Sequence, residues 1–233
     1  MRRRPLPVLL TVLTALAAVL AGPTAAAQAQ TTPRAAAHRP VILVHGYNAD
    51  PGVWGSLDSR LRAAGYTDGE IFRWGYDTHV SVNETLGGRF AAYVDEVRRT
   101  TGADRVDIVA HSFGSLPTRW YVKFGGGTAT VAHWVSLAGP NHGTSVAWAC
   151  ALWDQACRDM TPGSYVQKRL AEGDETPGAV SYTTFWSNCD EVINPDDSVP
   201  LTGATNRPAG CLDHNALLGD EAVGQGVLAA LAS

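Results

Sequence analysis

The chain has little basic charge, which excludes one large class of partner. Only two lysines occur, Lys123 and Lys168, and 18 basic residues stand against 22 acidic ones, so the formal net charge is −4. A nucleic-acid-binding domain needs a clustered excess of lysine and arginine to neutralise phosphates. We therefore expect no nucleic-acid partner.

Long apolar runs are also scarce, and the longest lies near the N-terminus. A basic start is followed by an apolar segment from Leu6 to Ala21 and then by small residues. This order is typical of a secretory signal peptide, and the segment is shorter than the ~20 residues of a membrane-spanning helix. We predict a signal peptide over residues 1–27, a disordered leader over 28–38, one domain over 39–233 and a secreted protein. A retained membrane anchor is the alternative.

Cysteine is absent from the N-terminal half of the chain. The four cysteines are Cys150, Cys157, Cys189 and Cys211. In an exported protein they are expected to form disulfides, and three pairings exist. We favour Cys150–Cys157 and Cys189–Cys211, because each pair closes a local loop.

The sequence also lacks the spacings of common metal sites. No cysteine pair has C-x-x-C spacing, which argues against zinc. The acidic residues of segment 190–197 lack the spaced oxygen ligands of a calcium loop. We expect neither a metal nor another cofactor.

One stretch carries a candidate nucleophile. Residues 105–110 read as a strand, and Ser112 follows between small residues, Ala110 and Gly114. In the G-x-S-x-G elbow a serine sits on a sharp turn between a strand and a helix, with its hydroxyl exposed near the helix N-terminus. Ala110 stands where glycine is commoner, a difference of one methyl group. We predict that Ser112 is a nucleophile.

The strand and helix patterns predict a parallel sheet. Apolar runs of strand length occur at 40–45, 105–110 and 131–137, and further strands are expected at 70–74 and 180–186. Helices are expected between them; the clearest ends at Gly102 and carries an apolar face of Leu86, Phe90, Val94 and Val97. Alternation of this kind predicts an α/β fold, a mainly parallel sheet with helices on both faces in one compact domain.

A serine needs a base to take its proton, and the order of the chain selects one. In α/β-hydrolases the order is nucleophile, acid, histidine, with the histidine in a loop after the last strand. Of seven histidines, His214 fits this place best. His111 is adjacent to the serine and is expected to point away from it.

The acid that orients the base is expected between these two residues, just beyond a strand. Asp190 follows the strand at 180–186 and is the favoured candidate. Asp196 and Asp197 are the alternatives. The favoured Cys189–Cys211 disulfide would hold the acid and base loops together.

An oxyanion hole requires two backbone donors. One is expected to be the N–H of Phe113, directly after the nucleophile. The other is expected from the loop after the first strand, where we choose Tyr47.

Five segments together resemble a known family. They are VILVHGY, VDIVAHSFG, SLAGPNHGT, SNCDEV and CLDHNALL, in this order. In these segments the chain resembles the small secreted bacterial lipases and esterases of the α/β-hydrolase fold, the class 2 lipases, from about Pro40 to the C-terminus. The resemblance implies hydrolysis of lipid-like carboxylic esters by Ser112, Asp190 and His214, with oxyanion donors Tyr47 and Phe113. The chain departs from the family in segment 141–179 and in its cysteines.

The expected function is therefore that of a secreted, monomeric carboxylic ester hydrolase, a lipase or carboxylesterase, whose partner is a lipid or ester substrate met at a lipid–water interface. An acyl-chain cleft could be lined by Trp54, Trp148, Leu152 or Trp153. Two alternatives remain. One is a non-catalytic ligand-binding protein on the same fold. The other is a serine hydrolase that acts on amides or by acyl transfer.

Overall fold

Six parallel strands form one sheet in the computed structural model, which describes residues 38–79 and 82–233. The spatial order is β2-β1-β3-β4-β5-β6, and every neighbouring pair is parallel. The strands are β1 (Val41–Val44), β2 (Ile71–Trp74), β3 (Val106–His111), β4 (Val131–Leu137), β5 (Ser181–Trp186) and β6 (Thr205–Pro208). The predicted signal peptide and nearly all of the predicted leader lie outside the described residues.

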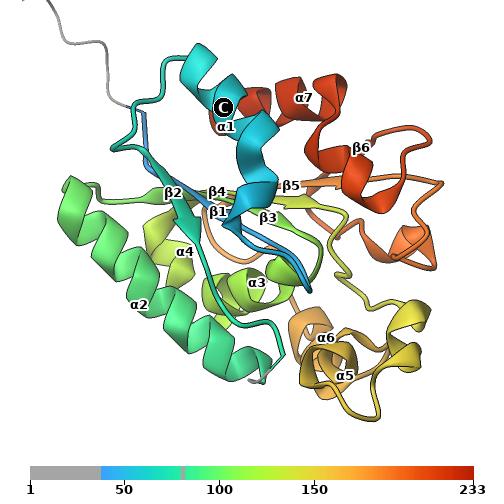
Figure 1. The fold of residues 1–233 in the computed structure, drawn as a ribbon. Helices are drawn as coiled ribbons and strands as arrows, with labels where there is room; N and C mark the ends of the chain where they lie inside the picture. The colour runs from blue at the N-terminus through green and yellow to red at the C-terminus, as the bar shows by residue number, and fades with distance from the viewer. Residues whose placement is uncertain (1–37, 80–81) are drawn as a thin grey trace, which may run out of the picture. The chain divides into compact units, whose positions relative to one another are not determined.

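Helices cover both faces of the sheet. Figure 1 shows α1 and α7 on one face and α2, α3 and α4 on the other. The α-helices are α1 (Gly55–Ala63), α2 (Asn83–Thr101), α3 (Ser115–Phe124), α4 (Gly127–Thr130), α5 (Gln155–Met160), α6 (Tyr165–Ala171) and α7 (Glu221–Leu231). Short 3-10 helices span Pro51–Trp54, Ser112–Gly114, Ser145–Ala149, Asp196–Ser198 and His214–Leu218.

The apolar periodicity explains where the core lies. All residues of β1, β3 and β4 are buried, as the continuous apolar runs predict for strands covered on both faces. The predicted apolar face of α2 is also buried, and the helix ends at Gly102 in a left-handed conformation with φ +72°. The predicted α/β architecture is therefore confirmed at the level of its elements.

Three local features differ from the sequence prediction. β6 was not predicted, because its four residues are exposed, three of them are polar and the fourth is a proline, and it lies at the edge of the sheet. The short helices α5 and α6 were not predicted, because they lie in the segment 141–179, whose glycines and prolines obscure a helical pattern. The last helix begins at Glu221 rather than near Ala216, because the Asp220 carboxylate accepts the N–H of Val223 and caps it there.

The parallel register brings the strand ends to one edge of the sheet. Val44 pairs with Ala110, and His111 pairs with Leu137, so the loops after β1, β3 and β4 begin side by side. Ligands of open α/β sheets bind at this edge. Among the described helices, none has the length and apolar character to cross a membrane.

Candidate active site

Ser112 occupies a sharp turn between β3 and the helices that follow it. Its φ is +53°, in the left-handed region that only a few per cent of non-glycine residues adopt. The 3-10 turn Ser112–Gly114 leads directly into α3, so the serine lies at the start of the helical segment. A strained backbone of this kind is typical of the serine in a G-x-S-x-G elbow, whose hydroxyl stands clear of the sheet.

Two glycines permit this turn. A Cβ at Gly114 would lie 2.5 Å from the carbonyl oxygen of His45, so the backbone after the serine passes too close to the end of β1 for any side chain. A Cβ at Gly46 would lie 2.7 Å from the Ser112 Cβ. The predicted need for a small residue two positions after the serine thus has a steric cause, and the loop after β1 is pressed against Ser112.

His214 and Asp190 form a buried pair. The His214 Nδ1 lies 2.8 Å from Asp190 Oδ2 and 3.0 Å from Oδ1. Asp190 Oδ1 also accepts the N–H groups of Val192 and Ile193, each at 2.9 Å. Burial alone would raise the pKa of Asp190, but the His214 interaction and the two N–H donors outweigh it and lower this pKa. The carboxylate is therefore ionised and fixed in place beside the imidazole.

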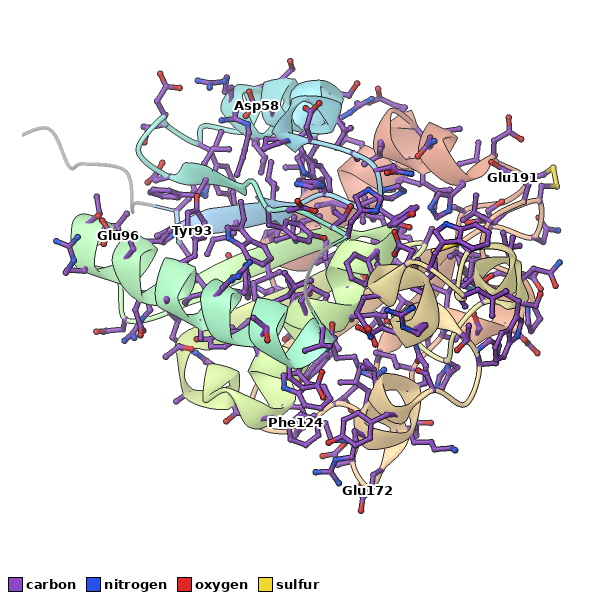
Figure 2. All side chains as sticks on the ribbon, turned by 60° about the horizontal axis from the view of Figure 1, so that its bottom comes forward. Asp58, Tyr93, Glu96, Phe124, Glu172 and Glu191 are labelled. Atoms are coloured by element: carbon purple, nitrogen blue, oxygen red, sulfur yellow. A yellow bond between two sulfur atoms is a disulfide. The ribbon has the colours of Figure 1, made fainter. Side chains whose placement is uncertain are left out.

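The competing acids do not reach this histidine. Asp196 and Asp197 lie in the 3-10 turn Asp196–Ser198, and none of the hydrogen bonds in the described part of the chain joins either carboxylate to His214. The backbone N–H of His214 instead donates to Glu191 Oε2 at 3.0 Å. Figure 2 shows Glu191 at the outer edge of the molecule.

Ser112 and His214 meet at one cavity of about 260 Å³. Within the described residues no hydrogen bond joins Ser112 Oγ to His214; both residues line the same space. The rest of the wall is mainly apolar and includes Val53, Val146, Ala147, Cys150, Cys157, Met160, Val192 and Leu218. A larger depression of about 730 Å³ lies between α1 and α7 and contains neither residue.

His111 lies inside the site, contrary to the expectation that it points away. It lines the same cavity, its ring centroid is 4.7 Å from that of His214, and its Nε2 is 3.4 Å from the His214 carbonyl oxygen. Burial, followed by the charge of the neighbouring His214, lowers the pKa of His111 to about 3. His111 is thus a neutral ring packed beside His214.

The two predicted oxyanion donors flank Ser112. The N–H of Phe113 lies in the first turn of a helical segment, where backbone donors have no partner within the helix. Tyr47 belongs to the loop after β1, which Gly46 brings against Ser112, and it lines the cavity. None of the hydrogen bonds found in residues 38–79 and 82–233 uses the Tyr47 N–H.

Sequence reasoning missed a polar network behind Tyr47. The Tyr47 hydroxyl donates to Asp154 Oδ2 at 2.9 Å, and His79 Nδ1 lies 2.5 Å from the same oxygen. His79 Nε2 lies 2.7 Å from Asn48 Oδ1. Asp154 is buried and also caps α5 through the N–H of Cys157. The network ties the Tyr47 loop to the segment 150–157, whose two cysteines line the cavity. This contact joins residues over 100 positions apart, which no local pattern could indicate.

Both favoured disulfides are present. Cys150 and Cys157 are bonded, and this cystine forms part of the cavity wall. Cys189 and Cys211 are bonded, which joins the residue before Asp190 to a residue three before His214. In the described residues no group of three or more histidine, cysteine, aspartate or glutamate side chains is arranged as a metal site.

The four residues suggested for the wall of an acyl-chain cleft do not line the cavity. Trp54 is buried in the core, and none of Trp148, Leu152 and Trp153 lines the cavity. These three side chains are instead exposed to solvent: Trp148 in the 3-10 helix Ser145–Ala149, and Leu152 and Trp153 in the loop closed by the Cys150–Cys157 disulfide. The wall is aliphatic, and its contributors come from several loops.

Comparisons with known proteins identify relatives of this chain. The family model described as Lipase (class 2) matches residues 38–204. A triacylglycerol lipase from Pseudomonas fragi is 34% identical over 105 residues, which make up 45% of this chain and 31% of that lipase. The alignment therefore spans about a third of the curated relative.

Solved structures share the fold. The mature form of Bacillus licheniformis lipase BlEst2 aligns with a TM-score of 0.73 and 17% identity, over 84% of this chain and 93% of that one. Aspergillus fumigatus lipase B aligns with a TM-score of 0.72 and 19% identity, over 84% of this chain and 52% of that one. These likenesses confirm the predicted α/β-hydrolase fold.

Proposed function

Because the chain belongs to the class 2 lipase family, we propose that it is a serine hydrolase that cleaves carboxylic esters of lipid-like acids. The observation that carries this proposal is the buried Asp190–His214 pair at a cavity shared with Ser112, which stands on a strained elbow. The curated relative named a triacylglycerol lipase adds support for a lipid ester as the substrate class.

The proposed reaction proceeds through an acyl-enzyme. Ser112 Oγ attacks the ester carbonyl carbon while His214 Nε2 takes the hydroxyl proton. The tetrahedral intermediate then expels the alcohol, which leaves with that proton. Water attacks the acyl-serine with the same imidazole as base, and the carboxylic acid is released. Asp190 accepts a hydrogen bond from the His214 Nδ1–H throughout, so the proton stays on Nδ1 and Nε2 is free to act as the base. The Ser112–His214 hydrogen bond is expected to form when substrate fills the cavity.

The negative charge of the tetrahedral intermediate needs donors that are already in place. The N–H groups of Tyr47 and Phe113 are proposed to supply them, because Phe113 directly follows Ser112 and Tyr47 belongs to the loop pressed against Ser112 and lines the cavity. The aliphatic wall suits an acyl chain, since apolar surface is removed from water when the chain binds.

We further propose that the enzyme is secreted and acts as a monomer. Residues 1–27 would be the signal peptide and residues 28–38 a leader, and residues 39–233 would form the catalytic domain. Two disulfides in one domain favour an oxidising compartment.

Covalent labelling tests the proposal. A p-nitrophenyl organophosphate should modify the protein once, at Ser112, and mass spectrometry of the digested protein locates the adduct. Ser112→Ala should abolish labelling and His214→Ala should slow it strongly, since the base is lost. A folded protein that does not react would instead indicate a non-catalytic ligand-binding protein. Parallel assays with an ester, an anilide and an alcohol acceptor then separate ester hydrolysis from amide hydrolysis and acyl transfer.

A further inference from the structure

Three large apolar side chains are exposed within six consecutive residues, 148–153. Trp148, Leu152 and Trp153 are 61%, 89% and 73% exposed, and we refer to them as the Trp patch. Apolar groups on a folded surface cost free energy in water, and clustered ones mark interaction surfaces. Tryptophan is also the side chain that prefers the boundary between water and lipid, because its ring is apolar and its N–H is polar.

Leu152 and Trp153 lie on a cross-linked loop, and Trp148 precedes this loop in the 3-10 helix Ser145–Ala149. The Cys150–Cys157 disulfide closes the loop, and the N–H of Trp153 donates to the Cys150 carbonyl. The Arg158 guanidinium donates to the Ala151 carbonyl at 3.1 Å. Asp154 anchors the loop from inside through Tyr47 and His79. These bonds fix the conformation of the loop that carries Leu152 and Trp153.

The patch adjoins the cavity of the candidate active site. Val146, Ala147 and both members of the disulfide line that cavity, and they flank Trp148 and Leu152 in the chain. Val146 is itself 43% exposed, so apolar surface continues from the cavity wall to the exterior. A protein seated on the patch would cover this side of the cavity, whereas a lipid surface would supply the substrate to it.

The charge of the protein indicates which kind of lipid surface it can bind. Between Ser145 and Cys157 only Asp154 is charged, and it is buried. The whole chain is acidic, with a net charge of −4, so an anionic membrane would repel it. A surface of neutral or zwitterionic lipid would not repel the protein in this way.

We propose that the Trp patch inserts into the surface of a neutral or zwitterionic lipid phase and holds the cavity against that surface. The inference rests on the proposed function for its substrate, but binding through the patch needs no catalysis. The two can therefore be tested separately.

Binding is measured with the inactive Ser112→Ala protein and vesicles of pure phosphatidylcholine in a flotation assay. The patch variant combines Trp148→Ser, Leu152→Ser and Trp153→Ser in the same background. We expect its partition coefficient to fall by about tenfold or more, since three exposed apolar groups are removed. Tyr165→Ser is the control: Tyr165 is as exposed as Trp148, at 61%, but lies on α6, away from the cavity-lining segment 146–157. It should change binding by less than about twofold.

Activity then separates the two proposals. With Ser112 restored, the patch variant should hydrolyse dissolved p-nitrophenyl acetate at the parent rate but hydrolyse esters embedded in vesicles more slowly. Circular dichroism and thermal unfolding establish that the variant is folded. The unmodified protein could cleave no ester while the Ser112→Ala protein still binds vesicles through the patch. In that case the proposed function is wrong and the proposed lipid binding is right.

Three results would overturn the inference. The patch variant could bind vesicles as well as the Tyr165→Ser control. The parent protein could prefer vesicles of phosphatidylglycerol, which are anionic. Sedimentation velocity could reveal a dimer that the patch variant lacks, in which case a second copy of the chain is the partner.

Discussion

Replacing Asp190 by Asn changes one atom of the candidate site and should disable its base. Asp190 Oδ1 accepts two backbone N–H groups, from Val192 and Ile193. An asparagine must keep its only oxygen there, because its NH2 group cannot accept those bonds. The NH2 group therefore replaces Oδ2 and points at His214 Nδ1, which lies 2.8 Å from that position.

The imidazole then has to change its tautomer. Facing an N–H donor, Nδ1 must be the acceptor, so the proton moves to Nε2. Nε2 is the atom proposed to take the proton of Ser112, and it can no longer do so. The same change in a serine protease triad lowers kcat by about 10⁴-fold, which corresponds to about 5.5 kcal/mol of activation free energy. We expect a loss of this size here, with little change in packing because the two side chains have nearly the same volume.

The assay is steady-state hydrolysis of p-nitrophenyl butyrate at pH 8, with Asp196→Asn and Asp197→Asn as controls of identical chemistry. Both controls should retain the parent rate, since neither carboxylate reaches His214. A folded Asp190→Asn protein that keeps more than about a tenth of the parent kcat would refute the reasoning about the tautomer. An inactive Asp196 or Asp197 variant would show that the acid was assigned to the wrong residue.

Three other perturbations have defined outcomes. Replacing Cys189 and Cys211 by serine should lower the free energy of unfolding by about 3 kcal/mol, as chain entropy predicts for a loop of this length, while the initial rate at 25 °C changes little; an immediate loss of rate in a folded protein would contradict a stabilising role. His111 stays neutral in the folded state, since its pKa is lowered to about 3, whereas the unfolded chain takes up a proton below about pH 6.5. The free energy of unfolding is therefore unaffected by this group above pH 6.5 and falls as the pH is lowered toward 3, by up to about 1.4 kcal/mol per pH unit. In His111→Gln the free energy of unfolding, measured with urea from pH 7 to 5, should depend less steeply on pH. An equal slope would argue against this assignment. Tyr47→Phe keeps the backbone donor but removes the hydrogen bond to Asp154, so kcat for a soluble ester should fall by about tenfold at unchanged KM; an effect on KM alone would mean that the bond shapes substrate binding instead.

The sequence was most informative where local pattern and burial agree. The apolar runs of β1, β3 and β4 required burial on both faces, and the face of α2 had a clear helical period, so the sheet and its covering helices could be predicted. The sharp turn at Ser112 was also predictable, because glycine at position 114 indicates a place where the backbone passes too close to a neighbouring strand for a side chain.

The surroundings of the site could not be predicted in this way. The contact of Tyr47 with Asp154 joins loops over 100 residues apart, and neither residue has a neighbour in sequence that signals it. Trp148 and Trp153 illustrate the opposite error: tryptophan is usually buried, and no local pattern indicated that these two would be exposed to solvent. His111 was judged by its position beside the serine, yet the left-handed backbone at Ser112 directs the two side chains into the same cavity.

The residues of the candidate site differ in how freely they can be substituted. Gly46 in the cavity wall and Gly114 just after Ser112 leave no space for a single added carbon, so no side chain can be introduced there. The aliphatic wall residues Val146 and Leu218 contribute side chains, which can be exchanged for larger or smaller ones. Selection for a new acyl group should therefore accumulate substitutions on the aliphatic side, and libraries for altered chain-length preference are best confined to it.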